Sequence, residues 1–251
     1  MIESEEIEEL QKALEKKTAQ LEATQQELER FSYSVSHDLR APLRAIEGFA
    51  KILGEDYSDK IDEDGQRYLK ILEASGQKMT RMLDELLQLS RLSRQEMSLS
   101  SVDMTELVQT VWNELREKDA ARKIEFKLNA LPGAWGDASL LHRVWTNLIS
   151  NAIKFSAPRK KAMIEISGES EPDRVQYCIT DNGVGFDSNV TSKLFGVFQR
   201  LHTEQEFSGC GMGLAIARRL VRRHAGEIWA QAKKNEGATF RFSLPRVDFA
   251  A

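Results

Sequence analysis

The sequence has 251 residues, of which 41% are hydrophobic, and a formal net charge of −4. This is the composition of a soluble globular protein with one large or two modest domains, and its acidic balance argues against a nucleic-acid partner. No apolar run approaches the ~20 residues of a membrane-spanning helix, and the acidic N-terminus lacks the pattern of a signal peptide. Cys178 and Cys210 match no metal-ligand spacing and fit a reducing compartment. These features predict a cytoplasmic protein with no direct membrane span.

Residues 1–30 carry the seven-residue repeat of a coiled coil, and the repeat continues to Val35. The first seam position is apolar throughout: Ile7, Leu14, Leu21, Leu28 and Val35. The second seam position holds Leu10, Lys17, Thr24 and Phe31. The polar residues in this seam weaken the pairing, so we predict two helices that can shift against each other. Because no sensor segment precedes the coiled coil, we expect an upstream sensor domain or partner outside this chain.

The helical pattern runs on through the pair His37–Asp38, with a kink expected at Pro42 because proline removes a helix hydrogen bond. Polar residues at 54–65 predict a turn. A second amphipathic helix follows, with its stripe at Tyr68, Leu72, Ser75, Met79, Met82, Leu86 and Leu89. Two such helices make a hairpin, and two hairpins joined by the coiled coil make a dimeric four-helix bundle. His37 lies outside the seam, two positions after Val35, and should therefore face solvent.

Residues 94–101 read as a polar linker, after which the pattern changes to mixed α/β. Helices are expected from Asp103, in a capping-box pattern with Glu106, to about Lys118, after Asp137, and at 213–223. Strands are expected at 124–128, 162–167, 174–180, 227–232 and 239–244. The predicted fold class is therefore α plus α/β, with a helical bundle followed by a sandwich in which helices cover one face of a sheet.

Three polar residues share one face of the helix that follows Asp137. Asn147, Asn151 and Lys154 are four and three residues apart, beside an apolar stripe. Amide oxygens of asparagine can ligate a hard cation such as Mg²⁺, and lysine can meet phosphate oxygens. This face is a candidate nucleotide site.

Two glycine clusters complete the candidate site. Asp181 ends a predicted strand and can accept a hydrogen bond from an exocyclic amine such as that of adenine, and Gly183 and Gly185 allow close backbone approach. The second cluster opens a helix whose N–H groups favour an anion: Gly209, Gly211 and Gly213. Either cluster alone is a weak signal, but both together with the asparagine helix predict nucleotide binding.

These segments resemble the sensor histidine kinases of two-component systems. SVSHDLRAPLR at Ser34–Arg44 is similar to the phosphoacceptor box, and WTNLISNAIKFS, DNGVGF, LFGVFQRL and GCGMGL are similar to the asparagine, first glycine, phenylalanine and second glycine boxes. Residues 31–95 resemble a HisKA-type dimerisation and phosphoacceptor domain, and residues 101–246 a Bergerat-type ATP-binding domain. The segment SHDLRAPLR is most similar to that of kinases whose sensor domains are photoreceptors or of the PAS type.

The resemblance implies a phosphoryl relay in a homodimer. His37 would take the γ-phosphoryl group of ATP, with Asp38 bound to the other ring nitrogen and raising its basicity. The group would then pass to an aspartate in the receiver domain of a response regulator. Many relatives carry Thr or Asn where this sequence has Ala41, and that residue positions a water molecule to dephosphorylate the regulator. An alanine methyl cannot hydrogen-bond water, so phosphatase activity by that route is in doubt.

The resemblance also implies roles for the nucleotide residues. Asn151 would hold Mg²⁺, Asn147 and Lys154 would lie near the phosphates, and Asp181 would read the adenine amine. Arg200 would steady the transferred charge, and residues 187–210 would form a lid over ATP.

Two other interpretations compete with the kinase. A nucleotide-gated dimeric scaffold with decayed chemistry would not need His37, Asp38, Asn151 and Asp181 intact. An ATPase of the gyrase or chaperone branch would need a carboxylate in the asparagine helix, where Ser150 and Asn151 provide none. The input signal, the regulator and whether a subunit phosphorylates itself or its twin stay open.

Overall fold

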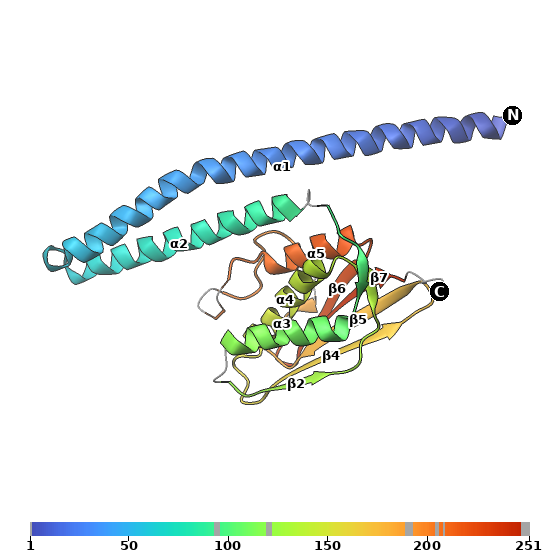
Figure 1. Ribbon diagram of the computed structural model, residues 1–251. Coiled ribbons are helices and arrows are strands. Elements are labelled where there is room, and N and C mark those ends of the chain that lie inside the picture. Colours follow the sequence, from blue (N-terminus) through green and yellow to red (C-terminus); the bar gives the residue numbers. More distant parts are fainter. Residues whose placement is uncertain are drawn as a thin grey trace. The chain divides into compact units, whose positions relative to one another are not determined.

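The computed structural model describes residues 2–92, 96–118, 122–188, 193–203, 206–207 and 209–246. The chain forms two compact units, Met1–Arg94 and Gln95–Ala251 (Figure 1). Several side chains of the first helix are outside the described set, among them those of five predicted seam residues: Ile7, Leu10, Leu21, Leu28 and Phe31. The predicted coiled-coil pairing through these residues therefore stays a prediction.

The first unit is the predicted helical hairpin. It consists of α1 (Ile2–Asp56), the short helix η1 (Ser58–Lys60) and α2 (Glu63–Leu92). Helix α1 runs through Pro42 without interruption. Ser36, Leu43 and Ala50 recur every seven residues on α1 and are buried. This spacing gives α1 one continuous face toward α2, where Leu87 and Leu92 are buried.

Two polar contacts fix the register of the hairpin. The Nη2 atom of Arg40 donates to Asp84 Oδ1 at 2.6 Å, and Thr80 Oγ1 donates to Glu47 Oε1 at 2.8 Å. Gly76 lies opposite Glu47, where an added Cβ would stand 2.6 Å from the Glu47 Cγ. A slip of α2 along α1 would break both contacts.

The hairpin also carries a second apolar face that α1 and α2 do not cover. Tyr68, Leu72 and Met79 of the predicted α2 stripe are 57%, 50% and 45% exposed, so this stripe does not face α1. On α1, five exposed apolar residues have helical spacings of three, four or seven and share one face: Val35, Leu39, Ile46, Phe49 and Leu53. Such a face is what the predicted four-helix bundle requires, because a second hairpin would cover it.

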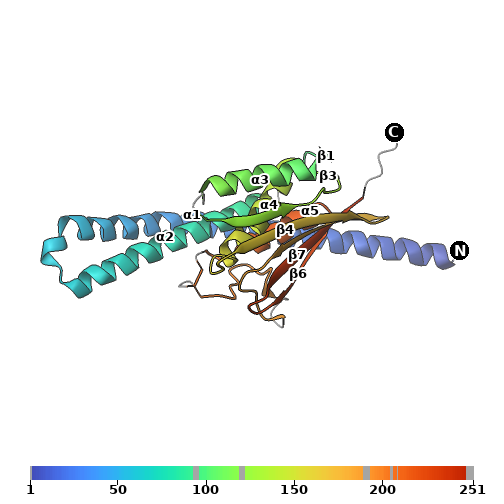
Figure 2. The ribbon, with the colours of Figure 1, turned by 90° about the horizontal axis from the view of Figure 1, so that it is seen from below.

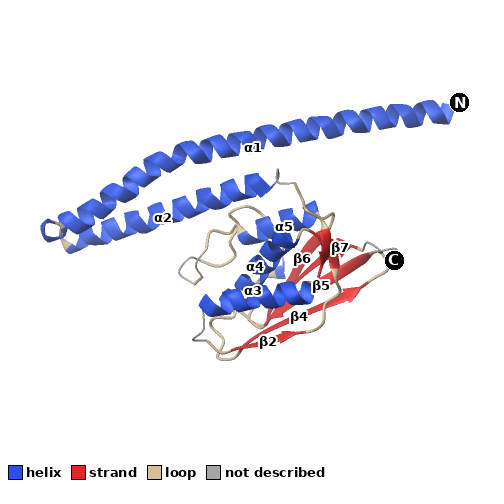
Figure 3. Cartoon of the chain, viewed as in Figure 1, coloured by secondary structure: helices blue, strands red, loops and turns tan. Residues whose placement is uncertain are grey.

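The second unit is a two-layer α/β sandwich. Its main sheet has the order β2-β4-β5-β7-β6, with β2 and β4 parallel and the other pairs antiparallel. The strands are β2 (Ile124–Leu128), β4 (Ala162–Ser170), β5 (Arg174–Asp181), β6 (Glu227–Lys233) and β7 (Gly237–Pro245). The helices are α3 (Met104–Lys118), α4 (Ala138–Phe155) and α5 (Gly213–Arg223). They lie together on one face of the sheet, as predicted (Figures 2 and 3).

Helix α4 packs onto the sheet through a large aromatic side chain. Trp145 is fully buried, and its ring meets Tyr177 of β5 and Phe242 of β7 edge-on at centroid distances of 6.0 and 5.2 Å. Inward residues of β4 and β5 alternate with exposed polar ones such as Glu165 and Thr180. Because of this alternation, the face of the sheet opposite the helices is exposed to water. The contacts of Trp145 hold α4 against the covered face.

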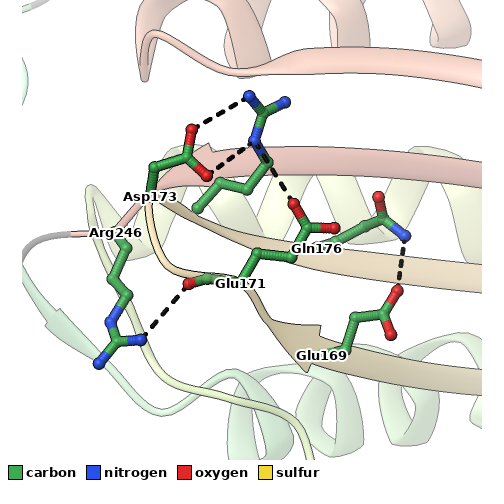
Figure 4. A network of polar contacts seen from close by, with 6 residues as sticks. Glu169, Glu171, Asp173, Gln176 and Arg246 are labelled. Atoms are coloured by element: carbon green, nitrogen blue, oxygen red, sulfur yellow. Dashed lines mark hydrogen bonds and ion pairs between the residues drawn. The ribbon is translucent and has the colours of Figure 1, made fainter.

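Polar contacts close the turn between β4 and β5 (Figure 4). Gln176 Nε2 donates to Glu169 Oε1 at 3.0 Å across the two strands. Arg246, just after β7, donates from its backbone N–H to Asp173 O at 2.9 Å and from Nη1 to Glu171 O at 3.4 Å. The end of β7 is thereby tied to the turn.

The predicted linker at 94–101 is partly wrong. Ser100–Val102 forms strand β1, which pairs antiparallel with β3 (Ala134–Gly136) in a separate small sheet. Strands of three residues are too short to show an alternating pattern, and the pairing joins segments far apart in the sequence. The entry into the second unit is thus part of its fold.

A buried carboxylate joins this entry to α4. Asp137 caps α4, accepting the backbone N–H groups of Ser139 and Leu140 at 3.0 and 3.1 Å. Its second oxygen accepts the N–H of Ser98 at 2.9 Å. Burial alone would raise the pKa of Asp137, but the hydrogen bonds from Ser139, Ser98 and Leu140 together lower it. The group therefore stays an anion at the N-terminus of α4, where the helix dipole favours it.

His224 links the end of α5 to the same place. Its Nε2 accepts the Asp137 N–H at 3.0 Å, and its Nδ1 donates to Leu220 O at 2.8 Å. A cation at this helix C-terminus would be favoured by the helix dipole, but the structure does not support one. Burial lowers the pKa of His224, and a ring nitrogen that accepts an N–H is unprotonated, so the ring is neutral.

Replacing Asp137 by Ala should lower the free energy of unfolding of the second unit by about 2 kcal/mol, because a cap and a buried acceptor are lost together. Urea denaturation followed by tryptophan fluorescence measures this unit alone, since all four tryptophans lie in it: Trp112, Trp135, Trp145 and Trp229. Asp103→Ala is the matched control, because Asp103 caps α3 through Thr105 and Glu106 at an exposed position. Its loss should be about 1 kcal/mol. Equal losses would mean that the Ser98 contact adds nothing.

Candidate functional site

The asparagine helix and the second glycine cluster come together in the structure. Asn147 Nδ2 donates to Arg143 O at 2.8 Å within α4, and its Oδ1 lies beside the start of α5. A Cβ added to Gly213 would stand 2.8 Å from that oxygen. Glycine at this position therefore allows α5 to begin against α4. The N-cap residue Met212 makes no side-chain cap to the first N–H groups of α5, and such groups suit an anion.

Lys154 extends over the same cluster. Its ammonium nitrogen lies 4.3 Å from the centroid of the Phe155 ring, and a Cβ added to Gly209 would stand 3.5 Å from it. Gly211 has φ +79°, and an added Cβ would meet Gln199 O at 2.6 Å. The positive end of α5 and the lysine thus surround a stretch of backbone that only glycine can form, as phosphate binding requires.

Asp181 and the first glycine cluster form a second wall. Asp181 is 4% exposed, and its Oδ1 accepts the N–H of Gly183 at 2.8 Å. Burial raises the pKa of Asp181 to about 6, although the hydrogen bonds from Gly183 and Ala238 and the charge of Arg159 act in the opposite direction. Because the folded-state pKa lies above the ordinary 3.8, protonation of Asp181 stabilises the fold, and this contribution is lost as the pH rises through about 6.

The glycines of this wall leave no room for a side chain. A Cβ at Gly183 would stand 2.6 Å from both Asp181 Oδ1 and Phe155 O. Gly185 has φ +60°, and an added Cβ would collide with Lys233 O in the β6–β7 hairpin. The wall is therefore made of backbone that lies close to Asp181.

Two residues that contact the first glycine cluster belong to no sequence motif, so they could not be identified from the sequence. Arg159 donates to three backbone carbonyls, and His202 Nε2 lies 3.1 Å from Gly185 O. The His202 ring also packs against Phe155 and Phe207 at centroid distances of 5.4 and 5.3 Å. His202 therefore lies against the first glycine cluster.

Arg200 lies in the segment before the second glycine cluster. Its Nη2 donates to Phe207 O at 2.7 Å. The contact holds two parts of the predicted lid together, and the predicted role of Arg200 toward transferred charge stays a prediction. Residues 189–192, 204–205 and 208 of that lid are outside the described residues.

Asn151 is half-buried on α4, one helical turn after Asn147. Its side chain makes no hydrogen bond to any residue that the structure describes, so its amide oxygen can accept another partner. In the same described set, no group of three or more His, Cys, Asp or Glu residues is arranged to hold a metal ion. These residues would suit a Mg²⁺ ion that is bound by the amide oxygen of Asn151 together with the phosphates of a nucleotide.

The His37–Asp38 pair lies on the helical hairpin. His37 Nδ1 lies 3.2 Å from Asp38 Oδ1, and the two side chains are 68% and 73% exposed. The ring also stacks on Tyr33 at a centroid distance of 6.5 Å. Since the carboxylate can only accept, Nδ1 carries a proton, and in the neutral ring the lone pair is then on Nε2. The ring faces solvent, as the heptad register predicted.

Comparison with known families decides what these two units are. Residues 27–95 match the His Kinase A (phospho-acceptor) domain, and residues 136–248 match the family described as histidine kinase-, DNA gyrase B-, and HSP90-like ATPase. The chain belongs to the sensor histidine kinases of two-component systems. The first match contains the His37–Asp38 pair, and the second contains α4, Asp181 and both glycine clusters.

Individual relatives agree with this family. Cyanobacterial phytochrome B of Nostoc sp. is 36% identical over 243 residues, which are 95% of this chain and 32% of that protein. The phytochrome-like protein Cph1 of Synechocystis sp. is 33% identical over 225 residues, 90% of this chain and 30% of that protein. The chain thus spans about a third of the length of these curated relatives. Their names agree with the predicted likeness to photoreceptor-linked kinases.

Solved structures share the fold. Full-length ShkA in complex with AMPPNP is 26% identical with a TM-score of 0.62, covering 88% of this chain and 47% of that one. The catalytic domain of the histidine kinase ThkA is 26% identical with a TM-score of 0.52, covering 61% of this chain and 100% of that one. Among the described residues, none of the sensor kinase's helices has the length and apolarity needed to cross a membrane.

The affinity of this kinase domain for ADP should fall as the pH is lowered through about 6, where Asp181 takes up a proton. A protonated carboxyl group no longer makes a charge-assisted hydrogen bond to an adenine amine. Asp181→Asn keeps the shape and removes the titration, so its profile contains only the titration of the nucleotide and of other groups. Equilibrium titration of both proteins with a fluorescent ADP analogue gives the difference. Parallel profiles would show that Asp181 does not bind the base.

Proposed function

We propose that this chain is an ATP-dependent protein-histidine kinase that phosphorylates His37 and passes the phosphoryl group to an aspartate of a response-regulator receiver domain. The observation that carries the proposal is the exposed His37 ring, whose Nδ1 is bound to Asp38. A nucleophile needs an accessible lone pair and a fixed tautomer, and in its neutral form the His37 ring held by Asp38 would have both.

The transfer exchanges one bond for another. The Nε2 lone pair of His37 attacks the γ-phosphorus of ATP, the bond to the bridging oxygen breaks, and ADP leaves. The imidazole becomes cationic, and Asp38 stabilises that charge through its bond to Nδ1. Little covalent chemistry is left to the second unit, whose task is positioning.

Each part of that positioning has its own residues. Asp181 and the wall of Gly183 and Gly185 would receive the adenine, and Lys154 with the start of α5 would receive the phosphates. Mg²⁺ at Asn151 would neutralise charge on the β- and γ-phosphates. The boundaries that we propose are 31–95 for the phosphoacceptor domain and 101–246 for the ATP-binding domain, with 1–30 as a coiled-coil signalling helix.

The proposed assembly is a cytoplasmic homodimer. The half-exposed apolar face of the hairpin supports it, because pairing would remove that face from water. The regulator would dock on α1 below His37, where Arg44, Gly48 and Lys51 are all exposed. The decayed scaffold is the second candidate, but it does not explain why His37 and Asp38 keep a productive geometry.

His37→Gln should abolish acid-labile, base-stable phosphorylation, because the amide lacks a nucleophilic lone pair on nitrogen. ATP binding should stay unchanged, since His37 lies in the other unit. Incubation with γ-labelled ATP measures the phosphorylation, and His142→Gln is the control at another histidine with an acidic partner, Glu114. Label that persists on a histidine of His37→Gln would rule out His37 as the acceptor, and an unlabelled wild-type chain that binds ATP would favour the scaffold.

Asn151→Asp should weaken Mg²⁺–ATP binding by roughly tenfold or more, because a carboxylate placed beside the phosphates adds repulsion of at least ~1.4 kcal/mol. Asn113→Asp adds the same charge at an exposed site on α3, and its affinity should equal that of the wild type. Titration with a fluorescent ATP analogue compares the three proteins. An unchanged affinity in Asn151→Asp would remove Asn151 from the site.

A further inference from the structure

Arg159 lies in the turn after α4, and its guanidinium group reaches three carbonyls from two other segments. Its Nε donates to Asn182 O at 2.8 Å, and its Nη2 donates to Gly183 O at 2.9 Å and to Asn235 O at 2.6 Å. The turn itself is closed by the Arg159 N–H, which donates to Ser156 O at 3.0 Å. One side chain thus joins the end of α4, the first glycine cluster and the β6–β7 hairpin.

The two segments that Arg159 joins also touch each other directly. The Asn235 N–H donates to Val184 O at 2.7 Å, and the Gly185 backbone lies against Lys233 O. The Asn182 side chain ties the same loop to β4, accepting the Met163 N–H at 2.9 Å and donating to Lys161 O at 2.9 Å. The loop also contacts the end of α4 directly, because the Val184 N–H donates to Phe155 O at 3.1 Å. Without Arg159, the loop would keep these backbone contacts but lose the guanidinium bonds that join the loop and the hairpin to the turn after α4.

Arginine suits this task and lysine does not. The guanidinium is planar, carries five N–H donors in a rigid fork and is always charged, so it can serve three acceptors in one plane. A lysine ammonium is a flexible point donor, which would satisfy one or two carbonyls without fixing their relative positions.

We infer that Arg159 is a positioning residue for base recognition, one that holds the backbone wall at 182–185 in register with Asp181 so that the site selects the exocyclic amine of adenine. The inference rests on the proposed function, since it assumes that an adenine nucleotide is the ligand. Arg159 donates to carbonyls of the protein and is assigned no contact with the nucleotide. It acts through the wall and through Asp181.

This role predicts a particular pattern of loss. The wall meets the base, which ATP and ADP share, so both affinities should fall by the same factor when Arg159 is changed. A nucleotide that lacks the exocyclic amine, such as IDP, gains less from the wall and should be affected less. Once ATP is bound, transfer to His37 depends on the phosphates, so the rate at saturating ATP should be retained.

The experiment compares Arg159→Lys and Arg159→Gln with Lys160→Gln, which removes a positive charge from the neighbouring exposed residue. Competition titrations give the affinities of the full chain for ATP, ADP and IDP, and γ-labelled ATP gives the rate at saturation. Arg159→Lys should weaken ATP and ADP roughly tenfold each, from about one to two lost hydrogen bonds, and reduce the ADP-to-IDP selectivity. Lys160→Gln should match the wild type. Arg159→Lys keeps the charge and some of the bonds, so it decides the matter if Arg159→Gln does not fold.

Three results would overturn the inference. Arg159→Lys with wild-type ADP affinity would show that the wall does not need the fork. Equal weakening of ADP and IDP would mean general damage to the domain. A wild-type chain that binds no adenine nucleotide would remove both this role and the proposed kinase. A wild-type chain that binds ADP but accepts no label would remove the kinase alone, and the affinities would still decide the role of Arg159.

Discussion

The nucleotide domain depends on one buried carboxylate, Asp137. Its side chain caps α4 and accepts the N–H of Ser98, while its own N–H is received by His224 at the end of α5. Helix α4 carries the asparagines and lysine of the site, and α5 begins at the second glycine cluster. The two helices are therefore fixed to each other at the start of α4 and the end of α5. They meet again where Asn147, midway along α4, lies beside Gly213 at the start of α5.

The site itself is built mostly from backbone. The wall proposed for the base is formed by a glycine loop and a hairpin turn that approach too closely for side chains, at Gly185 and at Gly237, whose added Cβ would collide with Asp181 O. The side proposed for the phosphates is formed by N–H groups at the start of α5 with Lys154 nearby. A buried carboxylate lies on the first side, and a cation with a helix N-terminus lies on the second. These opposite charges would orient a bound nucleotide.

Much of this arrangement could be predicted from the sequence. The hairpin, the five main strands and the three helices follow from heptad and alternating patterns. The spacing of the glycine clusters and of the polar residues on the asparagine helix predicts a nucleotide site. The misses have a common cause. Strands β1 and β3 and the roles of Arg159 and His224 depend on contacts with backbone atoms far away in the sequence, which leave no periodic trace. The apolar stripe at Tyr68 and Leu72 was recognised, but its direction was not, because both faces of α2 are apolar.

The position of α4 between β2 and β4 has a consequence for the order in which the protein is made. These two strands are parallel, so the chain must cross over through α4 before they can pair, and β7 lies between β5 and β6 although it is the last strand synthesised. The nucleotide domain therefore cannot close until nearly all of it has left the ribosome. The hairpin of α1 and α2 needs only local contacts and can fold early. During translation, the helix that carries His37 can therefore be complete before the sheet of the second unit has formed.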